Sequence, residues 1–166
     1  MKHPVSALAI VKWLALSLMA WGFVGSVHAH SHQIGQLLIV HPYATATVAG
    51  QPTGAVYLTS IRNRGSDPDR LVSASSEVAK HVALHEMQVE NDIMRMREVP
   101  FVEIPAKSEI TMKHSSSKGY HLMLEGLKRP LNKGDRFSVR LKFERAGTQD
   151  IEVWVEGMGQ DSKHQH

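Results

Sequence analysis

The sequence predicts an all-β fold, an antiparallel sandwich or barrel, and three observations support this prediction. Short stretches rich in β-branched and aromatic residues recur along the chain from Leu37 onward. Clusters of Gly, Pro, Asn and Asp separate these stretches, as in 63–68. No stretch keeps a helical period with capping residues, because the nearest candidate, 75–86, is interrupted by β-branched residues and histidines.

The expected strands are short and evenly spaced. Segment 136–143 alternates cleanly between polar and apolar residues, and 54–61 alternates almost as well, which is typical of strands with one buried face. The full set of expected strands is 37–41, 54–61, 71–74, 81–89, 93–99, 101–104, 109–112, 120–124, 136–143 and 151–155.

The N-terminal segment resembles a secretory signal. Lys2 and His3 precede an almost wholly apolar stretch, 5–27, which ends in Val27-His28-Ala29. We expect cleavage after Ala29 and export. An uncleaved anchor is the alternative, although the run 13–27 is short for a span of about 20 residues. The expected organisation is a signal peptide at 1–29, one domain at 30–157 and a flexible tail at 158–166.

Composition narrows the function classes. The 166 residues suit one domain, and the chain contains no cysteine, so any soft metal ligand must be a methionine. Loss of the signal removes Lys2 and Lys12 and no acidic residue, which leaves the rest close to neutral. No basic stripe with interleaved aromatic residues remains, so nucleic-acid binding is not expected.

Three short motifs carry a metal ligand at every second position. Residues i and i+2 of a strand point to the same side of a sheet, so each motif presents both of its ligands on one face. The motifs are His85-Glu-Met87, Met94-Arg-Met96 and His121-Leu-Met123.

The first two motifs fit one hairpin in either of two registers. A turn centred between Glu90 and Asn91 places His85 opposite Met96 and Met87 opposite Met94, close enough to share a metal. A two-residue turn at 91–92 keeps the faces and shifts the partners by two residues.

The ligand types indicate copper(I). Thioether sulfur is soft and suits copper(I), whereas imidazole suits several metals, so the mixed set without thiolate favours copper(I) binding over a blue-copper electron carrier. The simpler interpretation of any single methionine, including Met87, Met94 and Met112, is packing. No nucleophile, base and orienting group occur together, so we do not expect an enzyme.

These residues resemble a known family, the periplasmic copper chaperones of the PCu(A)C type. His85, ten intervening residues and Met96, followed by His121-x-Met123, resemble its signature. The resemblance extends from about Gly35 to Val155. Supporting segments are 68–76, 84–86, 94–97, 104–105 and 119–131.

The resemblance implies a cupredoxin-like antiparallel Greek-key β-sandwich with a copper(I) site formed by His85, Met96, His121 and Met123. It also implies a periplasmic location and copper delivery to the dinuclear copper centre of cytochrome c oxidase, alongside a thioredoxin-fold copper chaperone, with membrane contact only through the partner. Copper sequestration for resistance is the alternative. The interval before His121 is three residues longer than is usual in the family. The excess falls near His114, in a segment that we interpret as a loop.

Both ends of the expected mature chain carry additional candidate ligands. After cleavage at Ala29, a terminal amine, two amides and His32 could bind copper(II) in a square plane, with His30 as the first residue. The tail could bind copper(II) through Met158, His164 and His166.

Overall fold

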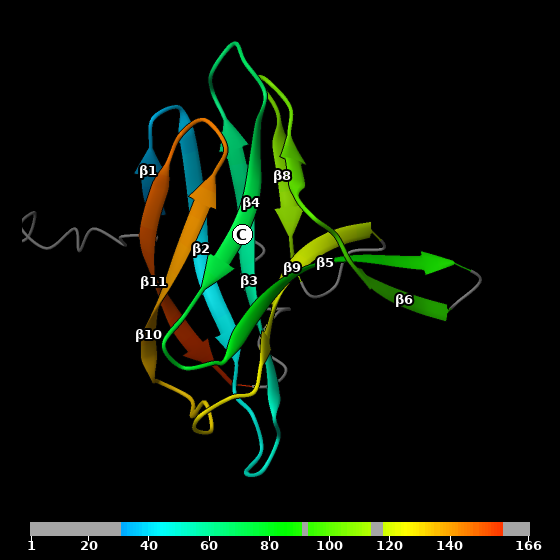
Figure 1. Cartoon of the computed structure of the whole chain (residues 1–166), viewed down its shortest axis with the longest axis vertical. Helices are drawn as coiled ribbons and strands as arrows, with labels where there is room; N and C mark the ends of the chain where they lie inside the picture. The colour runs from blue at the N-terminus through cyan, green and yellow to red at the C-terminus, as the bar shows by residue number, and fades with distance from the viewer. Residues whose placement is uncertain (1–30, 91–92, 114–117, 158–166) are drawn as a thin grey trace, which may run out of the picture.

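The computed structural model describes residues 31–90, 93–113 and 118–157, and this part of the chain is all-β, with no helix (Figure 1). Its strands lie close to the expected segments, which confirms the predicted fold class. The strands are β1 (Ser31–Ile34), β2 (Leu37–Thr45), β3 (Thr53–Asn63), β4 (Asp69–Ser75), β5 (His81–Glu90), β6 (Ile93–Glu98), β7 (Val102–Ile104), β8 (Glu109–Met112), β9 (Lys118–Glu125), β10 (Arg136–Phe143) and β11 (Thr148–Glu156).

One continuous sheet connects the strands in the order β6-β5-β9-β3-β2-β11-β10-β4-β7, with β1 added to β2 and β8 added to β3. All pairings are antiparallel except that of β2 with β11, which is parallel. The sheet curls after β11, which pairs with β2, so that β10 and β4 lie in front of β2 and β3 in the view of Figure 1. Side chains from both halves fill the interior, among them Leu58, Leu122 and Phe143.

Strand β1 is the one described element that the sequence analysis did not predict. It pairs with β2 through the register Ser31–Val40 to Ile34–Leu37. The segment is short and polar, so its own composition gives little signal for a strand. Its hydrogen-bonding partner is the first part of β2, 37–40, because β11 pairs only with 43–45.

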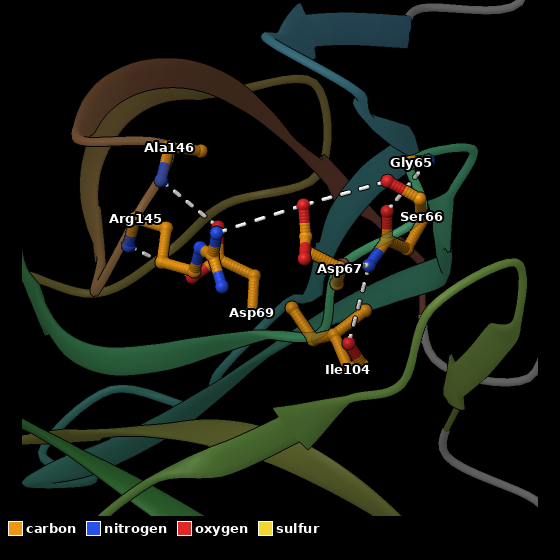
Figure 2. Close-up of polar contacts among 8 residues, drawn as sticks. Gly65, Ser66, Asp67, Asp69, Ile104, Arg145 and Ala146 are labelled. Atoms are coloured by element: carbon orange, nitrogen blue, oxygen red, sulfur yellow. Dashed lines mark hydrogen bonds and ion pairs between the residues drawn. The ribbon is translucent and has the colours of Figure 1, made fainter.

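A buried polar cluster holds the turns at one end of the sandwich (Figure 2). The carboxylate of Asp69 accepts hydrogen bonds from the backbone amides of Arg70, Arg145 and Ala146, at 2.7, 2.9 and 2.9 Å. Asn63 Nδ2 donates to the backbone carbonyl of Asp67 at 2.8 Å. These contacts fix the connection from β3 to β4 against the turn between β10 and β11.

The hairpin formed by β5 and β6 extends beyond the body of the sandwich (Figure 1). Strand β6 forms the edge of the sheet, and β5 connects it to β9 in the body. Among the described residues, no helix has the length and apolar character needed to cross a membrane.

Candidate metal site

The three ligand motifs occupy three adjacent strands. His85 and Met87 lie on β5, between Met94 and Met96 on β6 and His121 and Met123 on β9. Their period-two spacing and the register of the strands place all six side chains on the same side of the sheet. We call this surface the donor face; its members are His85, Met87, Met94, Met96, His121 and Met123.

The hairpin has the second of the two registers considered, so the predicted pairing of His85 with Met96 and of Met87 with Met94 is wrong. Glu90 is the partner of Ile93, which leaves two residues between the strands, and two-residue connections are the commonest in hairpins. A shift of two residues keeps every side chain on its predicted face. The observed pairs are His85–Glu98, Met87–Met96 and Val89–Met94.

His85 and Met96 are therefore diagonal neighbours. Diagonal neighbours are about 7–8 Å apart at Cα, within the reach of a long side chain. Methionine has three rotatable side-chain bonds, so Met96 can turn toward His85 without a change of register.

Strand β9 brings the third motif directly beside the first. His121 is the Cα partner of His85, and their rings meet edge to face with centroids 5.4 Å apart. Met123 lies between Ala83 of β5 and Ala55 of β3. The longer interval before His121 therefore does not separate the motifs. Residues 114–117, including His114, lie outside the described residues.

Exposure increases across the donor face from β9 and β5 toward the edge strand. Met87 and His121 are each only 4% exposed, whereas Met94 and Met96 are 51% and 56% exposed. His85 and Met123 are half-buried. A metal ion held here would have buried protein on its inner side and flexible, exposed thioethers on its outer side.

A cleft of about 280 Å³ covers most of the donor face. Its opposite wall is formed by the end of β2, the loop after it and the start of β3, including Thr47 and Gln51. His85 is not among the lining residues, but its ring contacts that of His121, which lines the cleft. The donors that line the cleft are Met87, Met94, Met96, His121 and Met123.

Small residues leave space between the donors. Gly119 is the β9 partner of Met87, and Ala55 and Ala83 flank Met123. Because these positions carry little or no side chain, the thioethers can turn toward a common point. The alternation of small residues with histidine and methionine is visible in the sequence. Which donors the small residues lie beside depends on the register of the strands.

The opposite face of the hairpin holds β5 and β6 together. Glu86 is buried, and its carboxylate accepts a hydrogen bond from Arg97 Nε at 2.7 Å. These two residues are Cα partners in the register observed. Burial, together with the negative charge of Glu86, raises the pKa of Tyr120 on neighbouring β9.

The chemistry of the donor face suits a soft metal ion. Within the described ranges, no three His, Cys, Asp or Glu side chains gather closely enough to hold a metal. The donors that do gather are two imidazoles and several neutral thioethers, which suit copper(I).

The remaining sequence candidates have mixed outcomes. Met112 is fully buried in the interior, as expected of a packing residue, whereas Met87 and Met94 line the cleft. His32 lies in β1 opposite Ile39. His30 and the tail residues Met158, His164 and His166 lie outside the described residues, so copper(II) binding at the ends stays a prediction.

Comparisons with known proteins identify the family. A family model described as "LpqE-like: Putative lipoprotein LpqE-like" matches residues 37–155, most of the chain. The chain belongs to the LpqE-like family. A relative from Leifsonia xyli subsp. xyli, named "Putative lipoprotein Lxx21020", is 36% identical over 96 residues. That match covers 57% of this chain and 56% of the relative, so the chain spans little more than half of the curated relative's length.

Solved structures similar to this LpqE-like chain are PCuAC domains. The copper-bound PCuAC domain from PmoF2 is 25% identical, with a TM-score of 0.65, and covers 77% of this chain and 98% of its own. The apo PCuAC domain from PmoF1 is 27% identical, with a TM-score of 0.66 and coverage of 77% and 99%. The copper(I) form of DR1885 from Deinococcus radiodurans is 25% identical, with a TM-score of 0.57 and coverage of 80% and 85%. The resemblance to the PCu(A)C type and the cupredoxin-like sandwich are confirmed.

Proposed function

We propose that this LpqE-like protein is a copper(I) metallochaperone of the cell envelope. The observation that carries the proposal is the donor face, where two imidazoles and several thioethers meet on adjacent strands and all of them except His85 line one cleft. The copper-bound PmoF2 domain and the copper(I) form of DR1885 support a copper site, and the description of the family as lipoproteins supports export and association with the envelope.

The proposed ligands are His85, Met96, His121 and Met123, with Met87 as an additional thioether. Met87 lies opposite Met96 and belongs to the cleft rather than to the interior cluster. Neutral thioethers leave the charge of copper(I) uncancelled and bind it reversibly, as a carrier requires. The inner donors hold the ion, and Met96, exposed on β6, is the first ligand that an acceptor protein can replace.

The proposed activity is ligand exchange rather than catalysis. An acceptor's soft ligand approaches from the edge of β6, and the methionines are displaced one at a time. By resemblance, the acceptor is the copper-centre subunit of cytochrome c oxidase, with a thioredoxin-fold copper chaperone as a second partner.

A competition titration with a chromophoric copper(I) chelator tests binding directly. We expect one copper(I) per protein, and separate replacement of Met96 and Met123 by leucine should weaken binding. Failure of the wild-type protein to compete would refute the proposal.

Gene deletion separates delivery from sequestration. Delivery predicts that the deletion strain loses oxidase assembly and recovers it when copper is added. Loss of copper tolerance with normal oxidase assembly would instead indicate sequestration.

A further inference from the structure

A row of aromatic side chains leads away from the donor face across the sheet. Tyr57 on β3 packs against His121, with ring centroids 6.0 Å apart, and Tyr43 on β2 lies opposite Tyr57 with a centroid distance of 5.3 Å. Trp154 on β11 is the Cα partner of Tyr43. We call Tyr57, Tyr43 and Trp154 the aromatic row.

The aromatic row runs from a buried end to a solvent-accessible end. Tyr57 and Tyr43 are 7% and 5% exposed, yet neither belongs to the cluster that fills the interior. Trp154 is half-buried, and its Nε1–H donates to Glu152 at 2.8 Å. Two of the chain's three tyrosines lie in this row.

The neighbouring copper site needs protection from oxidants. Copper(I) reduces hydrogen peroxide by one electron, and the oxidant formed attacks nearby thioethers. Oxidation of methionine to its sulfoxide replaces a soft sulfur donor with a polar group. Met87 and Met123 line the same cleft as His121 and Tyr57. An oxidant that formed at the copper and was not removed would therefore oxidise the proposed ligands themselves.

We propose that the aromatic row carries oxidising equivalents from the copper site to Trp154, where a reductant in solution removes them. This inference rests on the proposed copper(I) binding. Phenol and indole lose a single electron more readily than a thioether does, so an oxidising equivalent moves from the methionines to the row. The ring separations of 6.0 Å between His121 and Tyr57 and of 5.3 Å between Tyr57 and Tyr43 allow rapid transfer into the row.

The reaction balances with hydrogen peroxide as the oxidant. One copper(I), one peroxide, one proton and the phenol of Tyr57 give copper(II), the Tyr57 phenoxyl radical and two waters. The radical then takes a hydrogen atom, as an electron and a proton, from Tyr43, and Tyr43 takes one from Trp154. Glu152 accepts the hydrogen bond of the indole N–H and so favours its loss as a proton. A thiol or ascorbate-type reductant finally returns a hydrogen atom to Trp154.

Peroxide treatment of the copper(I)-loaded protein tests the route. Methionine sulfoxide at Met87, Met96 and Met123 is measured by mass spectrometry, and organic radicals are measured by freeze-quench electron paramagnetic resonance. We expect a tyrosyl or tryptophanyl radical in the wild-type protein and several-fold more sulfoxide in Tyr57→Phe, Tyr43→Phe and Trp154→Phe.

Tyr120→Phe is the matched control, because Tyr120 adjoins His121 in the chain but points to the other side of β9. It should leave both the sulfoxide yield and the radical unchanged. Aromatic cross-strand pairs also stabilise sheets, so the melting temperature and copper(I) affinity of each variant are measured alongside.

The outcomes separate the two proposals. Absence of copper(I) binding in the wild-type protein refutes the proposed function. Normal binding with equal sulfoxide in the wild type, Trp154→Phe and Tyr43→Phe overturns the aromatic route alone. These two variants lie one and two strands beyond Tyr57, so they test the route even if Tyr57→Phe disturbs His121.

Discussion

The thioether of Met87 lies between two other parts of the site. Its Cα partners are Met96 on β6 and Gly119 on β9, and its side chain is buried in the cleft. The sequence shows that Met87 shares a face with His85, but it cannot distinguish a ligand from a packing residue. Met112 has similar local surroundings in the sequence and lies in the interior. The distinction depends on which strands are neighbours in the sheet. Local periodicity does not carry this information.

Replacement of Met87 by leucine removes the sulfur and keeps nearly the same volume. Replacement of residues that only hydrogen-bond to metal ligands already lowers metal affinity by about 10–100-fold. Loss of a ligand itself should therefore weaken copper(I) binding at least about tenfold. Chelator competition measures the change. Met112→Leu is the matched control and should bind as the wild type does; equal affinities for the two variants would remove Met87 from the site.

The hairpin of β5 and β6 shows what periodicity can and cannot predict. Alternation predicted both strands and their faces, because every second side chain points the same way. It left two registers open, because a shift of two residues preserves the faces. The register with two intervening residues also pairs Glu86 with Arg97, an interaction between strands that the alternation of apolar residues does not reveal.

A disulfide cross-link distinguishes the registers. Gln88 and Arg95 are Cα partners in the structure, and the chain has no native cysteine. In the double variant Gln88→Cys/Arg95→Cys, we expect a bond to form on mild oxidation, because the Cβ atoms of directly opposed residues are about 4.5–5.5 Å apart. Mass spectrometry detects the loss of two hydrogens. Faster cross-linking of Gln88→Cys with Ile93→Cys would instead support the register with a turn at 90–91.

Loss of the cation beside Glu86 should destabilise the hairpin. In Arg97→Met, the buried carboxylate loses a charged hydrogen-bond donor, and we expect a loss of about 1–3 kcal/mol in the free energy of unfolding. Denaturant titration measures this loss. The double variant Glu86→Gln/Arg97→Met should recover part of it; strictly additive losses would show that the two side chains are not coupled.

At the scale of the whole molecule, the sandwich brings distant segments together around one core. The all-β class followed from local alternation and turn residues. The parallel pairing of β2 with β11 did not, since local patterns do not specify partners at opposite ends of the chain. The polar cluster at Asp69 was also missed, because its three hydrogen-bond donors are backbone amides.

Replacement of Asp69 by asparagine tests this cluster. An amide group would place N–H donors against backbone N–H donors, so we expect a loss of about 2–3 kcal/mol in the free energy of unfolding. Asp67→Asn, at an exposed neighbouring carboxylate, should change stability little. The folded Asp69→Asn protein should bind copper(I) as tightly as the wild type; a large fall in its affinity would contradict the separation of this cluster from the donor face.

X-ray absorption spectroscopy of the copper-loaded protein tests the central claim most directly, because it reports the atoms bound to the metal. We predict an edge typical of copper(I) and a first shell that contains both imidazole nitrogen and thioether sulfur. Combined replacement of Met87, Met96 and Met123 by leucine should remove most of the sulfur contribution. A first shell of nitrogen and oxygen alone in the wild-type protein would contradict a copper(I) site on the donor face.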